Sequence, residues 1–397
     1  MCSSFVGYYS QSWDFYNVTN SAITNDHISE LEIDTNGVVW VNASSSLHSF
    51  DGANWTTHPY YASDLYLDSQ GGMWMLSGQQ VYKYDSSNWQ LIVNLAIVDP
   101  SLTINFTNLA VDGNSQYMYL TGYDSVIYEY GGIVLNKFTA QNSAIPDVSF
   151  GTINIAPNGD VWFGCTEHVL VYDGSSFWVT TQIEMGLPPT SIGFSDILFS
   201  TNMTFVATVS GLAGLMQFDG VAWTNLGSAG LDLKSKACVV DENQKIWMGS
   251  YFDGLVSYDG VNWENFSASN SPFPGYDIWD LEVGPLNKLW LGTWGGGIWV
   301  FDPDGVPNSI NHYSAQPEIT FHQINGEVIF ESDIEIQIES VECFDVMGKR
   351  IRVRLDHISS TRSIVQIDDL PSGIFILSVK EKRSGRTTNH KFQKTNE

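Results

Sequence analysis

The sequence predicts an all-β protein, a seven-bladed β-propeller followed by a small Ig-like β-sandwich. Three observations predict it. A unit of about 43 residues recurs along residues 1–316, each unit holds four strand-like segments, and the composition changes after residue 316. Four short strands per unit at this period are typical of a propeller blade. A helical repeat would show a sustained 3.6-residue period, which is missing, and a β-helix would have a shorter repeat.

Two series of landmarks define the units. The first is an aromatic residue in a short apolar strand, at Trp40, Trp74, Tyr119, Trp162, Phe205, Trp247 and Trp290. The second is a Tyr/Phe-Asp-Gly-like turn, at Phe50–Gly52, Tyr84–Ser86, Tyr130–Gly131, Tyr172–Gly174, Phe218–Gly220, Tyr258–Gly260 and Phe301–Pro303. Asp-Gly between β-rich segments favours a tight turn, because glycine tolerates a positive φ.

The strands of the first unit are expected at Leu31–Asp34, Val38–Asn42, Leu47–Phe50 and Asn54–His58. Five units place a tryptophan four or five residues after the turn aspartate, and we expect most of these side chains in the core. They are Trp55, Trp89, Trp178, Trp223 and Trp263.

Ring closure is predicted from the N-terminal segment. Trp13–Asn17 resembles the outer strand of the sixth unit and precedes any first strand, so we expect it to complete blade seven and leave no unpaired blade. Ile310–Ser314 is a rival for that place.

Charge and aromatic content divide the chain into two predicted domains. Residues 1–316 hold 31 acids, six lysines and no arginine, whereas residues 317–397 hold 13 acids and 11 bases. All 14 tryptophans precede residue 300. We therefore expect a propeller over 1–316 and a second domain over 317–397, with the boundary near Gln316–Pro317.

The overall composition excludes several classes of protein. Hydrophobic residues make up 43% of the 397 residues, enough for a large core, and the formal charge is −27. Such a charge disfavours nucleic acid and anionic membrane surfaces as partners. No apolar run approaches the roughly 20 residues that a membrane helix needs.

The repeats resemble the two-component regulator propeller repeat. The best match is Leu281–Asp302, with Trp290-Leu291-Gly292-Thr293, three glycines at 295–297 and Phe301-Asp302. In that family such repeats often form extracytoplasmic sensors of hybrid kinases that respond to polysaccharide fragments. This chain shows no membrane segment and no kinase region, so the resemblance implies the fold more than that signalling role.

Residues 317–397 resemble the C-terminal sorting domain of type IX secretion cargo in the Bacteroidota. The resemblance rests on Val346–Arg350 and Leu370–Leu377, and the residues that carry the motif are Gly348, Lys349, Leu370, Gly373, Lys391 and Lys394. It implies an exported protein, secreted or held at the outer cell surface, with the type IX secretion machinery as a partner. A generic Ig-like domain is the alternative. The start, Met1–Val6, has no signal-peptide features, so for an exported protein we expect that this chain lacks its first residues.

Motifs for catalysis are missing. The sequence has no HExxH, P-loop, GxSxG or dinucleotide fingerprint, so no catalytic residue, cofactor or metal ion is predicted. The four cysteines lie far apart and are expected as buried thiols rather than a zinc site. Acid pairs that could serve a glycosidase are expected by chance among 31 acids.

A ligand site is expected at the mouth of the central channel, on loops held by rigid strands. The candidate residues follow the aromatic strands or precede the seventh blade: Trp294, Tyr251, Asp253, Tyr123, Asp124, His168, Trp279 and Asp277. Aromatic faces stack on sugars, and acids bind sugar hydroxyls. Trp294 beside three glycines is the first candidate.

Three functions remain open at this point. The first is a non-catalytic exported propeller that binds a glycan or a protein. The second is a polysaccharide lyase or hydrolase on a propeller, and the third is a structural or adhesive surface protein. The absence of arginine from residues 1–316 argues against acidic polysaccharides as ligands, because arginine is the natural partner of a carboxylate.

Overall fold

The computed structural model describes residues 12–397, apart from several short stretches. The stretches are 190–191, 201–202, 209–213, 228–234, 252, 304–318, 325–326, 333–337, 346–348, 360–361, 368–369, 372, 382–386 and 395–397. The described strands form two compact units, one spanning Trp13–Asp304 and the other following Gly305. The expected boundary near Gln316–Pro317 and the rival closing segment Ile310–Ser314 lie outside the described residues.

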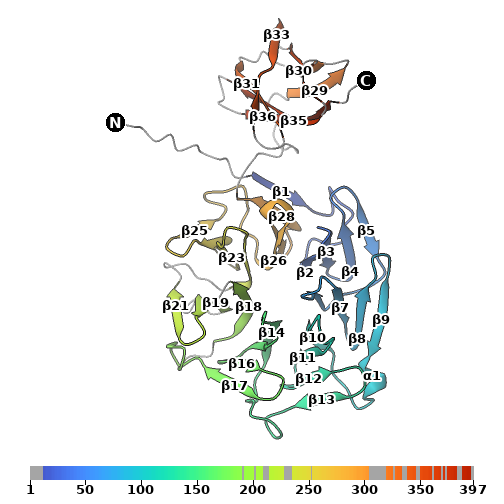
Figure 1. Cartoon of the computed structure of the whole chain (residues 1–397), viewed down its shortest axis with the longest axis vertical. Helices are drawn as coiled ribbons and strands as arrows, with labels where there is room; N and C mark the ends of the chain where they lie inside the picture. Colours follow the sequence, from blue (N-terminus) through green and yellow to red (C-terminus); the bar gives the residue numbers. More distant parts are fainter. Residues whose placement is uncertain are drawn as a thin grey trace. The chain divides into compact units, whose positions relative to one another are not determined.

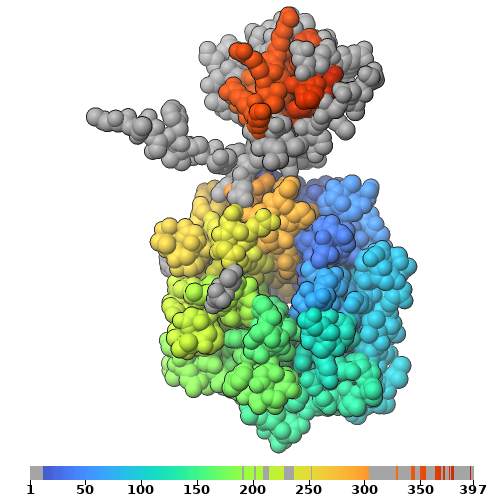
Figure 2. All heavy atoms as spheres, in the orientation of Figure 1, coloured from blue at the N-terminus to red at the C-terminus, as the bar shows by residue number. Residues whose placement is uncertain are grey.

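The first unit is a β-propeller, and the predicted fold class is confirmed. Within the described residues it consists of seven four-stranded sheets, which follow one another around a central axis (Figures 1 and 2). The sheets of blades one to three contain β2 (Ile28–Ile33), β3 (Val39–Ala43), β4 (Ser46–Phe50), β5 (Trp55–His58), β6 (Asp64–Leu67), β7 (Met73–Ser77), β8 (Gln80–Tyr84), β9 (Trp89–Asn94), β10 (Phe106–Val111), β11 (Met118–Gly122), β12 (Ile127–Tyr130) and β13 (Leu135–Phe138).

The remaining blades repeat this meander. Their strands are β14 (Phe150–Ile155), β15 (Val161–Cys165), β16 (His168–Tyr172), β17 (Phe177–Thr181), β18 (Phe194–Ser200), β19 (Met203–Thr208), β20 (Leu215–Phe218), β21 (Trp223–Gly227), β22 (Ser235–Val240), β23 (Ile246–Ser250), β24 (Leu255–Tyr258), β25 (Trp263–Phe266), β26 (Ile278–Gly284), β27 (Lys288–Thr293) and β28 (Ile298–Asp302). A single helical turn, α1 (Leu95–Val98), follows β9, and a 3-10 turn (Pro285–Asn287) joins β26 to β27.

Strand β1 (Ser12–Tyr16) is the outer strand of blade seven. The order of that sheet is β1-β28-β27-β26, so the two ends of the propeller sequence share one blade. The segment expected to complete this blade, Trp13–Asn17, overlaps β1. This arrangement leaves blade seven with the same four strands as its neighbours.

The hydrophobic core lies between neighbouring blades. The cluster that closes the ring, for example, joins Val41 and Phe50 of blade one to Trp290 and Val300 of blade seven. Another packs Trp40 against Met75 and Trp89 of blade two. Because each blade buries its faces only against its neighbours, the tryptophans hold the ring together.

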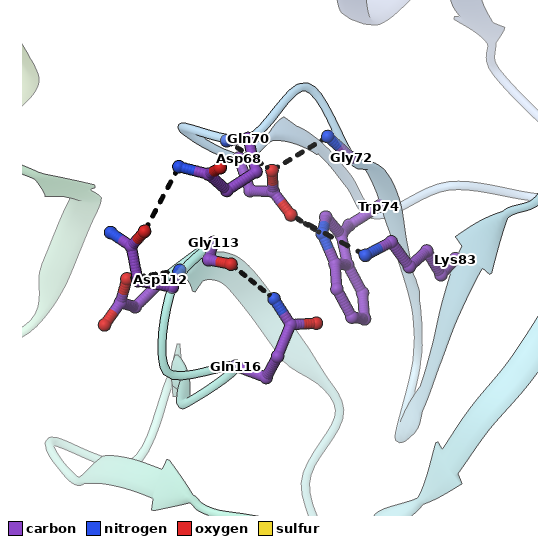
Figure 3. Close-up of polar contacts among 9 residues, drawn as sticks. Asp68, Gln70, Gly72, Trp74, Lys83, Asp112, Gly113 and Gln116 are labelled. Atoms are coloured by element: carbon purple, nitrogen blue, oxygen red, sulfur yellow. Dashed lines mark hydrogen bonds and ion pairs between the residues drawn. The ribbon is translucent and has the colours of Figure 1, made fainter.

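A repeated aspartate fixes several of these tryptophans. The indole N–H donates to an aspartate six residues earlier, from Trp74 to Asp68 at 2.7 Å and from Trp247 to Asp241 at 2.8 Å. The other oxygen of Asp68 accepts the backbone N–H groups of Gln70 and Gly72, each at 2.8 Å. Figure 3 shows Asp68 between the turn and the indole, with Lys83 beside it. One carboxylate therefore orders both the turn and the tryptophan that follows it.

The expectation for Trp178 is wrong. Phe177 pairs with Tyr172, as Trp263 pairs with Tyr258 in blade six, so Phe177 occupies the position of the repeated tryptophan. Trp178 is one residue further along and faces the other side of the sheet, because side chains alternate along a strand. It is 55% exposed.

The second unit is a β-sandwich of two four-stranded sheets. Their orders are β29-β30-β34-β33 and β32-β31-β35-β36. The strands are β29 (Ile319–Ile324), β30 (Glu327–Ser332), β31 (Ile338–Asp345), β32 (Arg350–Ile351), β33 (Arg354–Ser359), β34 (Arg362–Gln366), β35 (Gly373–Glu381) and β36 (Thr387–Lys394). Val328 and Val365 of the first sheet pack with Cys343 and Leu377 of the second.

Candidate binding site at the mouth of the channel

One face of the propeller carries the loops in which the candidate residues lie. In an antiparallel blade, the start of the inner strand and the loop between the second and third strands lie at the same end. Trp294 and Tyr123 lie in loops of the second kind, and Asp277 and Trp279 lie at the start of β26. The mouth is therefore built from the two kinds of loop that the sequence singled out.

Three aromatic rings form a stack at the mouth. The His27 ring lies 4.2 Å from the Trp294 indole at an interplanar angle of 9°, and the Trp279 indole lies 4.5 Å from it at 21°. Two nearly parallel rings at these distances would overlap each other if they shared a face, so they cover opposite faces of Trp294. Trp294 is 46% exposed, and its free surface is therefore the edge of the ring.

Backbone contacts hold this stack in place. The N–H of Trp294 donates to the carbonyl of Asp277 at 2.9 Å, and the N–H groups of Gly295 and Gly297 donate to the carbonyl of Asp26. A Cβ at Gly296 would collide with the Tyr276 ring, which explains the glycine there. Asp26 and His27 belong to the connection that enters blade one, so the stack spans the junction between blades seven and one.

Below the mouth, the channel holds a cavity of about 480 Å³. Its wall combines Trp279 and Tyr123 with six carboxylic acids from the inner strands. The acids are Glu30, Glu32, Asp64, Asp196, Asp280 and Glu282. No Lys, Arg or His belongs to the lining that the structure describes.

Four of the acids join neighbouring blades. Asp280 of blade seven accepts the backbone N–H of Leu31 at 2.5 Å, and Asp196 of blade five accepts that of Cys238 at 2.7 Å. Glu32 and Asp64 make the corresponding contacts with Leu67 and Leu109 of the next blade, at 3.1 and 2.5 Å. Bonds between an acid and a backbone N–H satisfy donors that would otherwise face the channel.

Burial shifts the pKa values of Glu32, Asp64, Asp196 and Glu282 upward. It raises the pKa of Glu32 to about 8, although the N–H groups of Ile33 and Leu67 oppose the change. It raises the pKa of Asp196 to about 6, and it holds the pKa values of Asp64 and Glu282 well above the ordinary range. The charges of neighbouring acids add to the effect at Glu32, Asp64 and Glu282. Burial thus favours the protonated form of these groups, in which a carboxyl offers an O–H donor rather than a negative charge.

The other candidate residues divide into Tyr123, which lines the cavity, and residues that are not among its described lining. Tyr123 is 87% exposed and lines the cavity. Burial raises the pKa of the Tyr251 phenol, and the charge of nearby Asp277 raises it further. Asp124 accepts the hydroxyl of Tyr128 at 2.6 Å. His168 contacts the carbonyl of Thr166 at 3.0 Å and does not line the cavity. The N–H of Asp253 donates to the hydroxyl of Ser250.

Sequence reasoning missed His27, and it did not bring the channel acids together in one cavity. The acids had a signal, because an acid stands two residues after the first apolar residue of several inner strands, as in Ile28-Ser29-Glu30 and Phe194-Ser195-Asp196. A β-bulge falls between these two residues in each case. His27 gave no signal, because its partner Trp294 is far away in the sequence.

Within the described residues, no three His, Cys, Asp or Glu side chains come together as metal ligands. Nor does that part of the chain contain a helix with the length and apolar character needed to cross a membrane.

Neither a protein-family model nor a curated protein matches the sequence. The fold matches the extracellular domain of the two-component system protein BT3049 from B. thetaiotaomicron, at 16% identity and a TM-score of 0.59, over 98% of this chain and 55% of that one. It also matches the corresponding domain of BT4673, at 14% identity and a TM-score of 0.58, over 96% and 53%. A catalytically inactive virginiamycin B lyase from Staphylococcus aureus with quinupristin matches at 10% identity and a TM-score of 0.60, over 74% and 99%.

The chain spans about half the length of the Bacteroides domains that it matches. At these identities the likeness shows the fold alone. The chain is thus a propeller whose neighbours include extracellular domains of two-component system proteins and a lyase.

Proposed function

We propose that this chain is an exported, non-catalytic propeller that binds a glycan or a protein partner at the mouth of its channel. The observation that carries the proposal is the cavity of about 480 Å³ beneath the aromatic stack, which has Trp279 and Tyr123 in its wall. That volume lies within the range of small-molecule sites, which combine apolar walls with a few polar groups.

The chemistry of the wall favours a neutral glycan. Ring faces of Trp279 and Tyr123 suit the C–H faces of sugars, and protonated or ionised carboxyls of the inner strands suit their hydroxyls. An anionic glycan would find no cation among the described lining residues. Uncharged hexose chains are therefore the first ligands to test.

A glycan array probed with the full-length chain tests this proposal. We expect binding to neutral glycans that is lost in Trp279→Ala and weakened in Tyr123→Ala. His168→Ala is the matched control, since that ring lies outside the cavity. Binding that survives Trp279→Ala would place the site elsewhere, and silence on every glycan would favour a protein partner or a structural role.

We further propose that the second unit directs export through the type IX secretion machinery. The extracellular neighbours support a location outside the cell. Within the motif, Leu370 is buried, Lys349 is exposed, Gly373 begins the central strand β35, and Lys391 and Lys394 lie on the edge strand β36. Gly348 lies outside the described residues.

Localisation in a host that has type IX secretion tests this second proposal. With a signal peptide supplied, we expect the full chain at the cell surface or in the medium, and a chain ending at residue 316 in the periplasm. Equal export of both would contradict a sorting role.

A further inference from the structure

Blade four departs from its neighbours at one pair of positions. In blades one, two, three, five and six, the second residue of the outer strand pairs with a residue of the third strand, and both are polar. The pairs are Ser49–Thr56, Lys83–Gln90, Glu129–Asn136, Gln217–Thr224 and Ser257–Glu264. In blade four the pair is Val171–Trp178. An exposed indole thus stands where the repeat places polar groups.

Trp178 borders a groove between blades four and five, with a volume of about 270 Å³. Trp162 of blade four lines it, and Phe218 and Trp223 of blade five form the opposite wall. The ring of Trp162 lies 5.9 Å from Phe218 and 6.4 Å from Trp223.

The equivalent contacts between blades one and two are shorter. Trp40 lies 4.6 Å from Tyr84 and 5.1 Å from Trp89. The groove between blades four and five lies between aromatic walls and has room for a small ligand.

In two other blades, a lysine ammonium covers the face of the tryptophan that is equivalent to Trp162. In blade two, the ammonium of Lys83 lies 4.5 Å above the Trp74 ring and 3.9 Å from Asp68 (Figure 3). In blade six, the ammonium of Lys245 lies 4.5 Å above the Trp247 ring and is paired with Glu264 at 3.3 Å. In both blades a cation–π contact and an acid hold the ammonium.

Blade four has Trp162 at the position of Trp74 and Trp247, but it has a lysine at neither of the positions that cover those rings. Val171 has the place of Lys83, since both pair with the strand that carries the tryptophan. Asp160 has the place of Lys245, because each stands two residues before the tryptophan. The groove therefore has a carboxylate where blade six has an ammonium, and its described lining contains no base.

The acid of this groove has a free oxygen. Asn158 donates to Oδ2 of Asp160 at 2.7 Å, and the described residues give Oδ1 no hydrogen bond. The aspartate that holds the indole N–H in blades two and six is Ala156 in blade four. The negative charge has thus moved from the buried turn to the rim of the groove.

We propose that this groove binds a small organic cation through its alkylammonium group. The cation takes the place that Lys83 and Lys245 fill in their own blades, between the rings of Trp162 and Trp178 and beside Asp160. Quaternary ammonium groups suit such a site, because they are large, weakly hydrated and attracted by several aromatic faces at once. The site is separate from the channel.

Proton NMR on the full chain with choline as the probe tests the proposal. Aromatic ring currents should move the N-methyl resonance upfield in a saturable manner over the millimolar range. The neutral isostere 3,3-dimethylbutan-1-ol should bind at least about tenfold more weakly, because it lacks the charge. Trp178→Ala should weaken choline binding about tenfold, and Asp160→Asn should weaken it severalfold and reduce its dependence on salt.

Two further variants make the outcome decisive. Trp178→Phe should retain most of the affinity, which separates loss of the aromatic wall from misfolding. Trp294→Ala at the channel mouth should bind choline as the unmodified chain does. Equal affinity for choline and its isostere, undiminished choline binding in Trp178→Ala, or no saturable shift would each overturn the proposal.

Discussion

Replacing Trp13 by alanine tests how the ring is closed. The Trp13 ring lies 4.4 Å from Phe301 and stacks at 5.5 Å on Phe273, with Trp299 at 6.2 Å. Phe301 and Trp299 belong to β28, so Trp13 binds the first strand of the propeller to the last one. Removing this side chain leaves a cavity at the junction where the two ends meet.

The size of the effect follows from the packing. Truncating a well-packed tryptophan to alanine costs about 3–5 kcal/mol, and the partial exposure of Trp13 places it near the lower end, at about 3–4 kcal/mol. Unfolding entropy is about 2.1 cal/mol/K per residue, or roughly 0.6 kcal/mol/K for the roughly 290 residues of the propeller. The Tm should therefore fall by about 5–7 °C.

Tryptophan fluorescence during thermal unfolding is the appropriate assay. All 14 tryptophans precede residue 300, so the signal reports the propeller and not the sandwich. Trp178→Ala is the matched control, because it truncates the same residue type on an outer strand but at a site 55% exposed. If Trp13→Ala lowers the Tm no more than Trp178→Ala, β1 does not contribute to closure as its contacts indicate.

Three further predictions concern the channel, the thiols and the mouth. Burial raises the pKa of Glu282, so the folded chain holds this proton more tightly than the unfolded chain. The stability that this difference contributes is present below the ordinary glutamate pKa of 4.5, and it is lost as the pH rises through the pKa of the folded state. Glu282→Gln should therefore raise the Tm more at pH 8 than at pH 5, and an equal change at both would contradict this account. Burial also raises the pKa values of the Cys165 and Cys238 thiols, so iodoacetamide should modify them only after unfolding, as followed by mass spectrometry; labelling of the folded chain would show that these sites open. Gly297 has a φ of +74°, and a Cβ there would collide with the carbonyl of Tyr16. Gly52 has a φ of +93° but no close contact at its Cβ position, so Gly297→Ala should lower the Tm more than Gly52→Ala. Equal losses would show that backbone strain alone matters.

The fold could be predicted from sequence because its determinants are local and repeated. The first expected strands differ from β2 to β5 by a few residues at most, since turn signals and alternation fix each meander. The segment of β1 can be identified as an outer strand because the residues around Trp13 resemble those around Trp263. In a repeat protein, the sequence pattern of one strand thus identifies the equivalent strand of another blade.

The mouth could be predicted only in part. Topology alone places Trp294, Tyr123 and Trp279 at the same end of their blades, whatever their side chains do. The stacking of His27 on Trp294 could not be foreseen, because it depends on how blade one meets blade seven after closure. Sequence spacing also cannot reveal that both faces of Trp294 are covered, which limits a ligand to its edge.

Trp178 shows why departures from the repeat carry more functional information than the repeat itself. Counting from the turn aspartate placed it among the structural tryptophans, but pairing gives that role to Phe177. Once Phe177 fills the structural position, the packing of the blade does not require an indole at the next residue. The same blade has Ala156 where blades two and six have the aspartate that accepts the indole N–H, and it has Asp160 and Val171 at the places of Lys245 and Lys83. Trp178, Asp160 and Val171 all line one groove. A ligand explains their coincidence more simply than independent drift, and for this reason the choline titration tests more than the role of one side chain.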